Sequence, residues 1–129
     1  MAKKIVLADT SLLIDFFRKS DKSNSKLISL VKEGYIFCIC VITEYEIYSG
    51  ATNQQLSYWQ DFLEKIEVIH LDQSAVKQAV IINNKLKAKR KQIDLADLFI
   101  AAIAVSNHLP IATLNKKHFE RVEDLILVE

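Results

Sequence analysis

The sequence predicts a single α/β domain, an α/β/α sandwich around a mainly parallel sheet of four to five strands. Short apolar runs alternate along the chain with longer segments of helical periodicity, which is the order of repeated β-α units. Only two Gly and one Pro occur, so long flexible linkers are not expected. With 129 residues, half of them hydrophobic, the chain can form one real core and not two independent ones. We therefore expect one domain over residues 1–129.

In the first half of the chain, runs rich in β-branched and aromatic residues predict strands, and apolar residues at helical spacing predict helices. Thr10 or Ser11 is expected to cap the first helix, and Gly34 to stop the second. Thr43 is expected to start the third helix, with Glu46 at capping-box spacing from it. The expected elements are, in order, a central strand over residues 5–8, helices over 12–17 and 24–33, a strand over 35–42, the helix from residue 43, and a helix over 54–65.

The second half continues the alternation. Asp72 or Ser74 is expected to cap a long helix. Asp94 caps the next helix, which is apolar nearly all round and is therefore expected to be buried. The expected elements are, in order, a short strand over residues 68–71, helices over 75–91 and 95–107, a fourth strand over 111–114, and a fifth short strand or edge over 125–128.

Net charge says little about partners, so any nucleic-acid contact must come from local clusters, and hydropathy does not indicate a membrane protein. Lys and Arg number 17 against 16 acidic residues, so the chain lacks the overall basic character of a tight duplex binder. No apolar stretch reaches the length of a membrane span. The apolar run near the start is interrupted by Asp9 and Asp15, and no small-residue cleavage site follows it. We expect a cytoplasmic protein without a membrane partner, in which Cys38 and Cys40 are buried, reduced side chains.

Four polar residues far apart in the chain are expected to meet outside the carboxyl ends of the strands, where open α/β folds gather their chemistry. They are Asp9 in IVLADTS, Glu44 in VITEYE, Asp97 in DLADLFIAA and Asn115 in ATLNKKHF. Three carboxylates that converge there need a cation. The pattern therefore predicts a divalent-metal site, with hydrolysis of a phosphodiester as its chemistry.

Each of these residues also has an ordinary structural interpretation. Asp9 and Asn115 suit turns, and Glu44 in a first helical turn suits the helix dipole. Asp97 lies three residues after the expected cap, yet its apolar neighbours place it on a buried helix, where a carboxylate needs a partner or a metal. His118, beside an aromatic residue, suits plain packing.

The segments DTSLLIDFF, TEYEIYSG, DLFIAAIAV and TLNKKHF resemble, in order and spacing, the PIN-domain ribonucleases, especially the VapC-like toxins of type II toxin-antitoxin pairs. The likeness spans essentially the whole chain. It implies a PIN fold, a Mg²⁺- or Mn²⁺-dependent endoribonuclease, frequent homodimerisation, and inhibition by a small antitoxin encoded alongside.

The resemblance maps the family's acids onto Asp9, Glu44 and Asp97 as metal ligands, with Glu44 also orienting the attacking water. The fourth family position, often Asp, falls on Asn115, and this loss of a charge keeps open a degenerate PIN module that binds RNA or protein without cleaving it. An aspartyl-phosphate phosphohydrolase is a more distant alternative, because it would need an acid where this chain has Ser11.

Single-stranded or looped RNA is the expected substrate, because its strand can bend into a pocket that a stiff duplex cannot enter. The basic run over residues 85–91 could hold an RNA backbone, but it equally suits the dipole at the end of a helix, and we interpret it as a solvated face. Trp59 is of a kind that more often packs in a core, but with Tyr45 and Tyr48 it gives two adjacent helices enough aromatic surface for the antitoxin cleft that the resemblance implies. The expected contacts to substrate are Thr10, Ser11, Lys116, Lys117 and Arg121.

Overall fold

The centre of the molecule is a parallel sheet with the strand order β3-β2-β1-β4 in a computed structural model that describes residues 4–128. The predicted α/β class is confirmed. An isolated parallel bridge joins Ile111 to Leu127, so the expected fifth strand is reduced to a single bridge. The four strands are β1 (Lys4–Ala8), β2 (Tyr35–Cys40), β3 (Val68–Ile69) and β4 (Ile111–Ala112).

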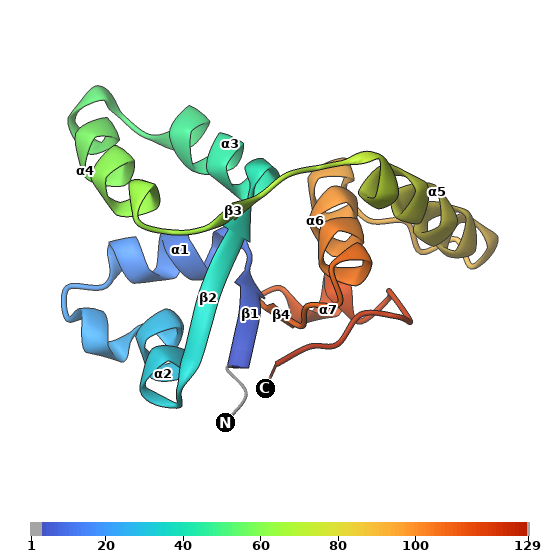
Figure 1. The fold of residues 1–129 in the computed structure, drawn as a ribbon, viewed down its shortest axis with the longest axis horizontal. Helices are drawn as coiled ribbons and strands as arrows, with labels where there is room; N and C mark the ends of the chain where they lie inside the picture. Colours follow the sequence, from blue (N-terminus) through green and yellow to red (C-terminus); the bar gives the residue numbers. More distant parts are fainter. Residues whose placement is uncertain (1–3, 129) are drawn as a thin grey trace.

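Helices cover both faces of this sheet (Figure 1). The elements on one side are α1 (Thr10–Arg18), the 3-10 turn η1 (Lys22–Asn24), α2 (Lys26–Lys32), α3 (Val41–Gly50) and α4 (Asn53–Glu64). Those on the other side are α5 (Gln73–Ala88), α6 (Leu95–Ser106) and the short α7 (Lys116–Phe119). In the described part of the chain, no helix is both long and apolar enough to cross a bilayer.

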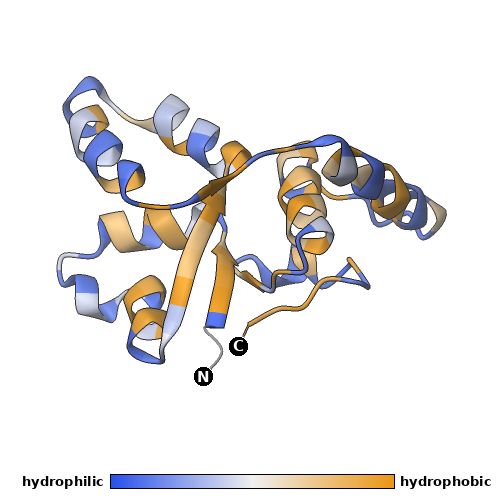
Figure 2. Ribbon diagram, in the orientation of Figure 1, coloured by the Kyte–Doolittle hydropathy of each residue, from blue (hydrophilic) through white to orange (hydrophobic). Residues whose placement is uncertain are grey.

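Alternate residues of β1 supply two separate cores, because successive side chains of a strand point to opposite faces. Val6 and Ala8 pack with buried side chains of α1, α2 and α4, whereas Leu7 packs with those of α5 and α6. All three are fully buried. Figure 2 shows α6 as a hydrophobic helix beside the sheet, as its nearly continuous apolar sequence predicts. These two cores fix the carboxyl end of β1 between the two helical layers.

Two predicted helix starts are wrong. Asp9, and not either of the two hydroxyl residues after it, is the N-cap of α1, since its Oδ1 accepts a hydrogen bond from the Leu12 amide at 3.3 Å. Helix α3 begins at Val41, directly after β2 and without a side-chain cap. Thr43 is therefore buried inside the helix, and Glu46 takes no part in a capping box. Both corrections concern residues that border the candidate site.

The caps of the two helices that follow β3 were better predicted. Asp72 caps α5, because its Oδ1 accepts a hydrogen bond from the Ala75 amide at 2.9 Å. Asp94 occupies the N-cap position of α6, but its side chain accepts no capping hydrogen bond. Helix α5 ends at Ala88, so the last residues of the basic run lie in the loop that follows.

Candidate active site

The carboxyl ends of β1 and β4 open onto a cleft of about 680 Å³, at the edge where open α/β sheets bind ligands. Residues of α1, α3, α6 and the loop after β4 line it. Four carboxylates are among the lining residues, and one of them, Asp15, forms an ion pair with Lys19 at 3.5 Å. The other three are Asp9, Glu46 and Asp97.

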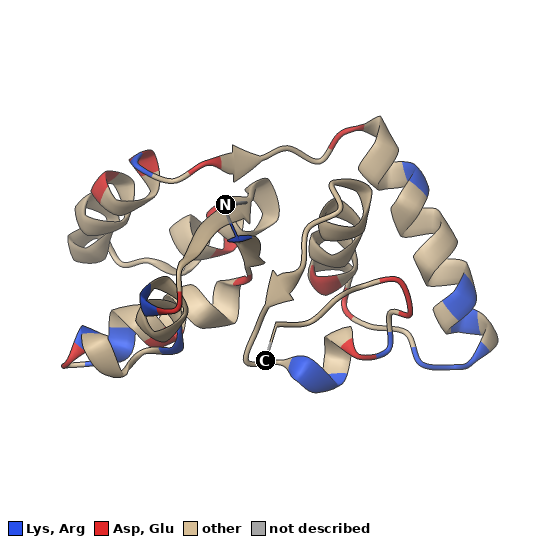
Figure 3. Ribbon diagram, turned by 60° about the horizontal axis from the view of Figure 1, so that its bottom comes forward, with Lys and Arg blue, Asp and Glu red and all other residues tan. Residues whose placement is uncertain are grey.

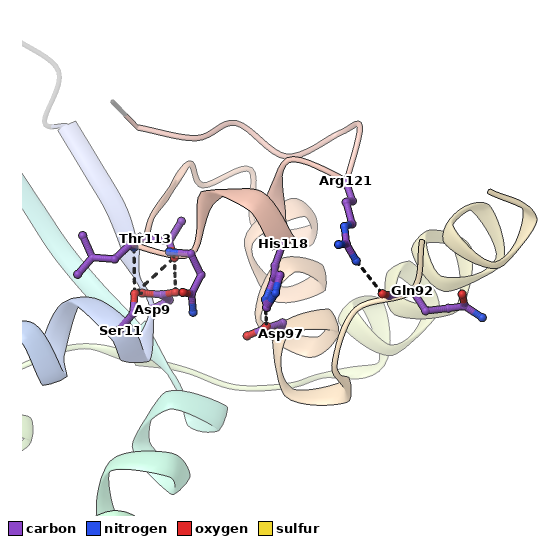
Figure 4. Close-up of polar contacts among 9 residues, drawn as sticks. Asp9, Ser11, Gln92, Asp97, Thr113, His118 and Arg121 are labelled. Atoms are coloured by element: carbon purple, nitrogen blue, oxygen red, sulfur yellow. Dashed lines mark hydrogen bonds and ion pairs between the residues drawn. The ribbon is translucent and has the colours of Figure 1, made fainter. Parts of the chain in front are cut away.

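Asp9 lies at the base of the cleft, and its side chain is nearly inaccessible, with 2% of its surface exposed. Figure 4 shows Ser11 and Thr113 pointing at its carboxylate. Ser11 donates to Oδ1 at 2.6 Å, and Thr113 donates to Oδ2 in a short hydrogen bond. Within the described part of the chain, Asp9 has no basic partner. A buried carboxylate without such a partner favours binding of a cation.

Burial raises the pKa of Asp9 above its ordinary value, because desolvation penalises the charged form. The hydrogen bonds from Ser11, Thr113 and the Leu12 amide partly offset this effect. The negative charge of Asp97 raises the pKa further, so these two carboxylates interact across the cleft. Metal coordination would favour the charged form of Asp9 and offset the repulsion between the two carboxylates.

Thr113 is a site residue that the sequence interpretation missed. Its hydroxyl is buried, donates to Asp9 and accepts a hydrogen bond from the Asn115 amide at 2.8 Å. Ser11 accepts a hydrogen bond from the Leu114 amide at 3.0 Å. These contacts fasten the loop after β4 to the start of α1. The only signal in the sequence was the position of Thr113 directly after an apolar strand.

Glu46, and not Glu44, faces the cleft with the two aspartates. Thr10 donates to Glu46 Oε1 at 2.6 Å, and its hydroxyl lies 3.2 Å from that of Thr43. Glu44 is half-buried elsewhere on α3 and raises the pKa of Tyr48 through its charge, after the larger effect of burial. Glu46, and not the predicted Glu44, therefore lines the cleft, and the hydrogen bond from Thr10 holds its carboxylate there.

Asp97 and Asn115 line the cleft as expected. The Asp97 side chain is 18% exposed, and its Oδ2 lies 3.2 Å from Nδ1 of His118, whose side chain is 45% exposed (Figure 4). His118 is thus a neighbour of the acid and not only a packing residue. Asp94 is exposed and lies outside the lining of the cleft.

The predicted basic contacts lie beside the cleft, not in it. Lys116 and Lys117 line a neighbouring hollow beyond Asn115. Arg121 donates to the backbone carbonyl of Gln92 at 3.0 Å and points away from Asp9 in Figure 4. The basic residues that do line the cleft, Arg18 and Lys19, come from the last turn of α1 and the residue after it.

The aromatic surface expected on α3 and α4 is only partly present. Tyr45 is 70% exposed, but Trp59 is 2% exposed and therefore belongs to the core. The indole of Trp59 packs against the ring of Phe17, with centroids 5.0 Å apart, and edge-on against Phe62. The prediction that Trp59 lies on an accessible partner surface is wrong.

No three His, Cys, Asp or Glu side chains within residues 4–128 converge closely enough to enclose a metal ion. Such a closed cage is not what Mg²⁺ needs, because it keeps several waters and takes one or two carboxylates from a protein. Asp9 and Asp97, which face the same cleft and repel each other, meet that requirement. The donor set consists of oxygen atoms and fits a hard divalent cation.

A model of the PIN domain matches residues 6–125 of the sequence. The chain belongs to the PIN-domain family. Among its relatives, Ribonuclease VapC1 of Methanocaldococcus jannaschii is 35% identical over 120 residues, which cover 92% of this chain and 82% of that protein.

Solved structures share the PIN fold over nearly the full length. VapBC2 from Rickettsia felis, bound to a DNA fragment from its promoter, superposes with a TM-score of 0.84 at 24% identity, covering 96% of this chain and 97% of that one. A toxin-antitoxin complex from Klebsiella pneumoniae gives a TM-score of 0.73 at 25% identity, covering 94% and 95%. The cleft at the carboxyl ends of β1 and β4 is thus set in a PIN fold.

Proposed function

We propose that this PIN-domain protein is a divalent-metal-dependent endoribonuclease and the toxin of a toxin-antitoxin pair. The observation that carries the proposal is the buried, unneutralised Asp9 facing Asp97 and Glu46 in one cleft. The similarity to a ribonuclease that covers most of both chains supports RNA as the substrate. Its substrate class is single-stranded or looped RNA.

Asp9 and Asp97 are the residues that hold Mg²⁺ or Mn²⁺, directly or through water. The cation, when bound, lowers the pKa of the attacking water and offsets negative charge on the phosphate in the transition state. Glu46, fixed by Thr10, orients the attacking water through its carboxylate. Asn115 adds a neutral amide at the rim of the cleft. Water is the proposed nucleophile: it forms the new bond to phosphorus while the bond to the 3′-oxygen breaks, so the products carry a 5′-phosphate and a 3′-hydroxyl.

The proposed partners are RNA and a cognate antitoxin, with a homodimer as the working assembly in the cytoplasm. The neighbouring structures are toxin-antitoxin and VapBC complexes, which supports the antitoxin. Tyr45, exposed on the helix that also carries Glu46, is the side chain on which we expect an antitoxin to dock.

Cleavage by the purified chain tests this proposal. Single-stranded RNA should be cut with Mg²⁺ or Mn²⁺ and left intact in excess chelator, and Asp9→Asn should abolish cutting while the protein stays folded. Expression of the wild type alone should arrest growth, and expression of Asp9→Asn at the same level should not. Unchanged cleavage in chelator, or a 2′,3′-cyclic phosphate product, would contradict the mechanism. A chain that binds Mg²⁺ and RNA in calorimetry without cleaving would be the degenerate module.

A further inference from the structure

We propose that two separate cationic contacts hold the RNA strand on opposite sides of the bond that is cleaved. Arg18 forms the first, and Lys117 with Lys91 forms the second. The inference rests on the proposed function and specifies how that site positions its substrate.

The first contact is Arg18 at the end of α1. Its side chain is exposed and lines the cleft, and it forms no ion pair or hydrogen bond with another described residue. The next residue, Lys19, is already paired with Asp15. A guanidinium can bind phosphate oxygens through two parallel hydrogen bonds, which suits Arg18 to an RNA backbone entering an acidic cleft.

The second contact follows from the continuity of the surface beyond the carboxylates. Leu114 and Asn115 line both the cleft and the neighbouring hollow of about 490 Å³. That hollow shares Lys117 and Glu120 with a third one, also of about 490 Å³, which Lys91 lines. A bound strand can therefore pass from the carboxylates over an exposed Leu114, with 51% of its surface free to contact a base or ribose, to Lys117 and Lys91.

The two contacts lie on different sides of the acids. Helix α1 leads away from β1 on one side, and α7 lies on the other (Figure 1). Figure 3 shows Lys and Arg on α7 and around the end of α5, with acidic residues of the segment after α7 beside them, and further Lys and Arg around α1 and α2. A phosphate backbone carries its charges at regular intervals, so cations that flank an acidic centre can bind the phosphates on either side of the one at the centre.

Salt-dependent binding tests each contact. With Asp97→Asn as a non-cleaving background, single-stranded RNA affinity is measured against salt concentration. Arg18→Gln and Lys117→Gln should each reduce the slope of log affinity against log salt by about 0.7, the value for one phosphate contact on a single strand. Lys77→Gln is the matched control, because Lys77 is an exposed cation on α5 that lines neither the cleft nor the two hollows, and it should leave the slope unchanged. Melting temperatures confirm that the variants fold.

Shortened substrates test the opposite placement. In cleavage assays Arg18→Gln and Lys117→Gln should raise KM more than they lower kcat. When the RNA is shortened on one side of the cleavage site, one variant should become equal to wild type, and shortening on the other side should do the same for the other variant. The inference is overturned if one truncation abolishes both effects, or if Arg18→Gln behaves as Lys77→Gln while the wild type cleaves. A wild type that neither binds nor cleaves RNA overturns the proposed function as well.

Discussion

At the scale of single residues, Asp9 caps a helix and, under the proposed function, also binds the cation. Its Oδ1 caps α1, and both oxygens accept hydrogen bonds from buried or half-buried hydroxyls. The sequence offered these as alternatives, a turn residue or a metal ligand, whereas one carboxylate with several lone pairs can serve both. A substitution of Asp9 therefore disturbs both roles at once, whereas a change of pH alters the charge of its carboxyl group and keeps the side chain.

The pH dependence of cation binding should follow the raised pKa of Asp9. Because burial raises this pKa above the ordinary value of 3.8, protons compete with Mg²⁺ at a higher pH than for an exposed Asp. In the metal-free protein the same shift contributes stability at low pH that is lost as pH rises through the folded-state pKa. Calorimetric titrations of Mg²⁺ at decreasing pH should show affinity falling before exposed aspartates protonate. Constant affinity down to pH 4 would contradict the assignment.

Glu46→Gln should reduce cleavage by about 100-fold or more, as expected for loss of a positioned base, while Glu44→Gln should stay within about threefold of wild type. Glu46 lines the cleft with the two aspartates, and Glu44 does not. Single-turnover cleavage at saturating RNA distinguishes the two, since the variants remove the same charge from the same helix. Equal losses would indicate that the effect comes from the charge of α3 and not from a positioned group.

The choice between these two acids shows why the sequence alone could not complete the site. Residues two apart on a helix point about 160° apart, to nearly opposite sides, so only one of Glu44 and Glu46 can face the cleft. Helix α3 follows β2 without a loop or a side-chain cap, and capping signals therefore gave no guide to its geometry. Asp9 and Asp97 were predictable because each lies near the junction of an apolar segment with a helix.

At the scale of elements, the site depends on the loop after β4 being fastened to the start of α1. Thr113 and Ser11 make this connection over about a hundred residues of sequence, and such long-range hydrogen bonds leave no local pattern. The strands themselves were predictable from their apolar runs. Their ends were less so, since β2 stops at Cys40 and only one bridge remains of the expected fifth strand.

Thr113→Val should destabilise the protein by about 1–3 kcal/mol, because it leaves the buried Asp9 Oδ2 and the Asn115 amide without their partner. Cleavage should fall too, since the carboxylate loses a fixed orientation. Thr113→Ser keeps the hydroxyl and should retain most of both properties. Urea unfolding of the three proteins measures the difference. A valine variant as stable as the serine variant would show that the hydroxyl does not hold the loop.

At the scale of the whole molecule, we expect the proposed site to lower the stability of the metal-free fold. Two parallel β-α junctions and α6 bring carboxylates together at one edge of the sheet, and the two cores hold them there. The architecture was predictable from the alternation of strands and helices, and so was the repulsion between Asp9 and Asp97, but which glutamate of α3 shares the cleft with them was not.

Asp97→Asn should therefore abolish cleavage and raise the melting temperature of the metal-free protein. The charge of Asp97 disfavours the ionised form of Asp9, so neutralising it relieves a repulsion of roughly 1 kcal/mol after screening, about 3–5 °C for a domain of this size. The contact with His118 that is lost is half-exposed and contributes little. Mg²⁺ should stabilise the wild type more than the variant, because it binds the native wild-type site more tightly.

Thermal melts with chelator and with Mg²⁺ distinguish an Asp97 that is needed for cleavage but lowers the stability of the metal-free protein from a purely structural Asp97. Asp94→Asn is the matched control, since it removes the same charge one helical turn earlier, outside the cleft and without losing a capping hydrogen bond. Asp94→Asn should neither raise the melting temperature in chelator nor reduce the stabilisation by Mg²⁺. If Asp97→Asn instead melts clearly lower in chelator and still cleaves RNA, then Asp97 supports the fold through its contact with His118, and the cation must be held by Asp9 and Glu46 alone.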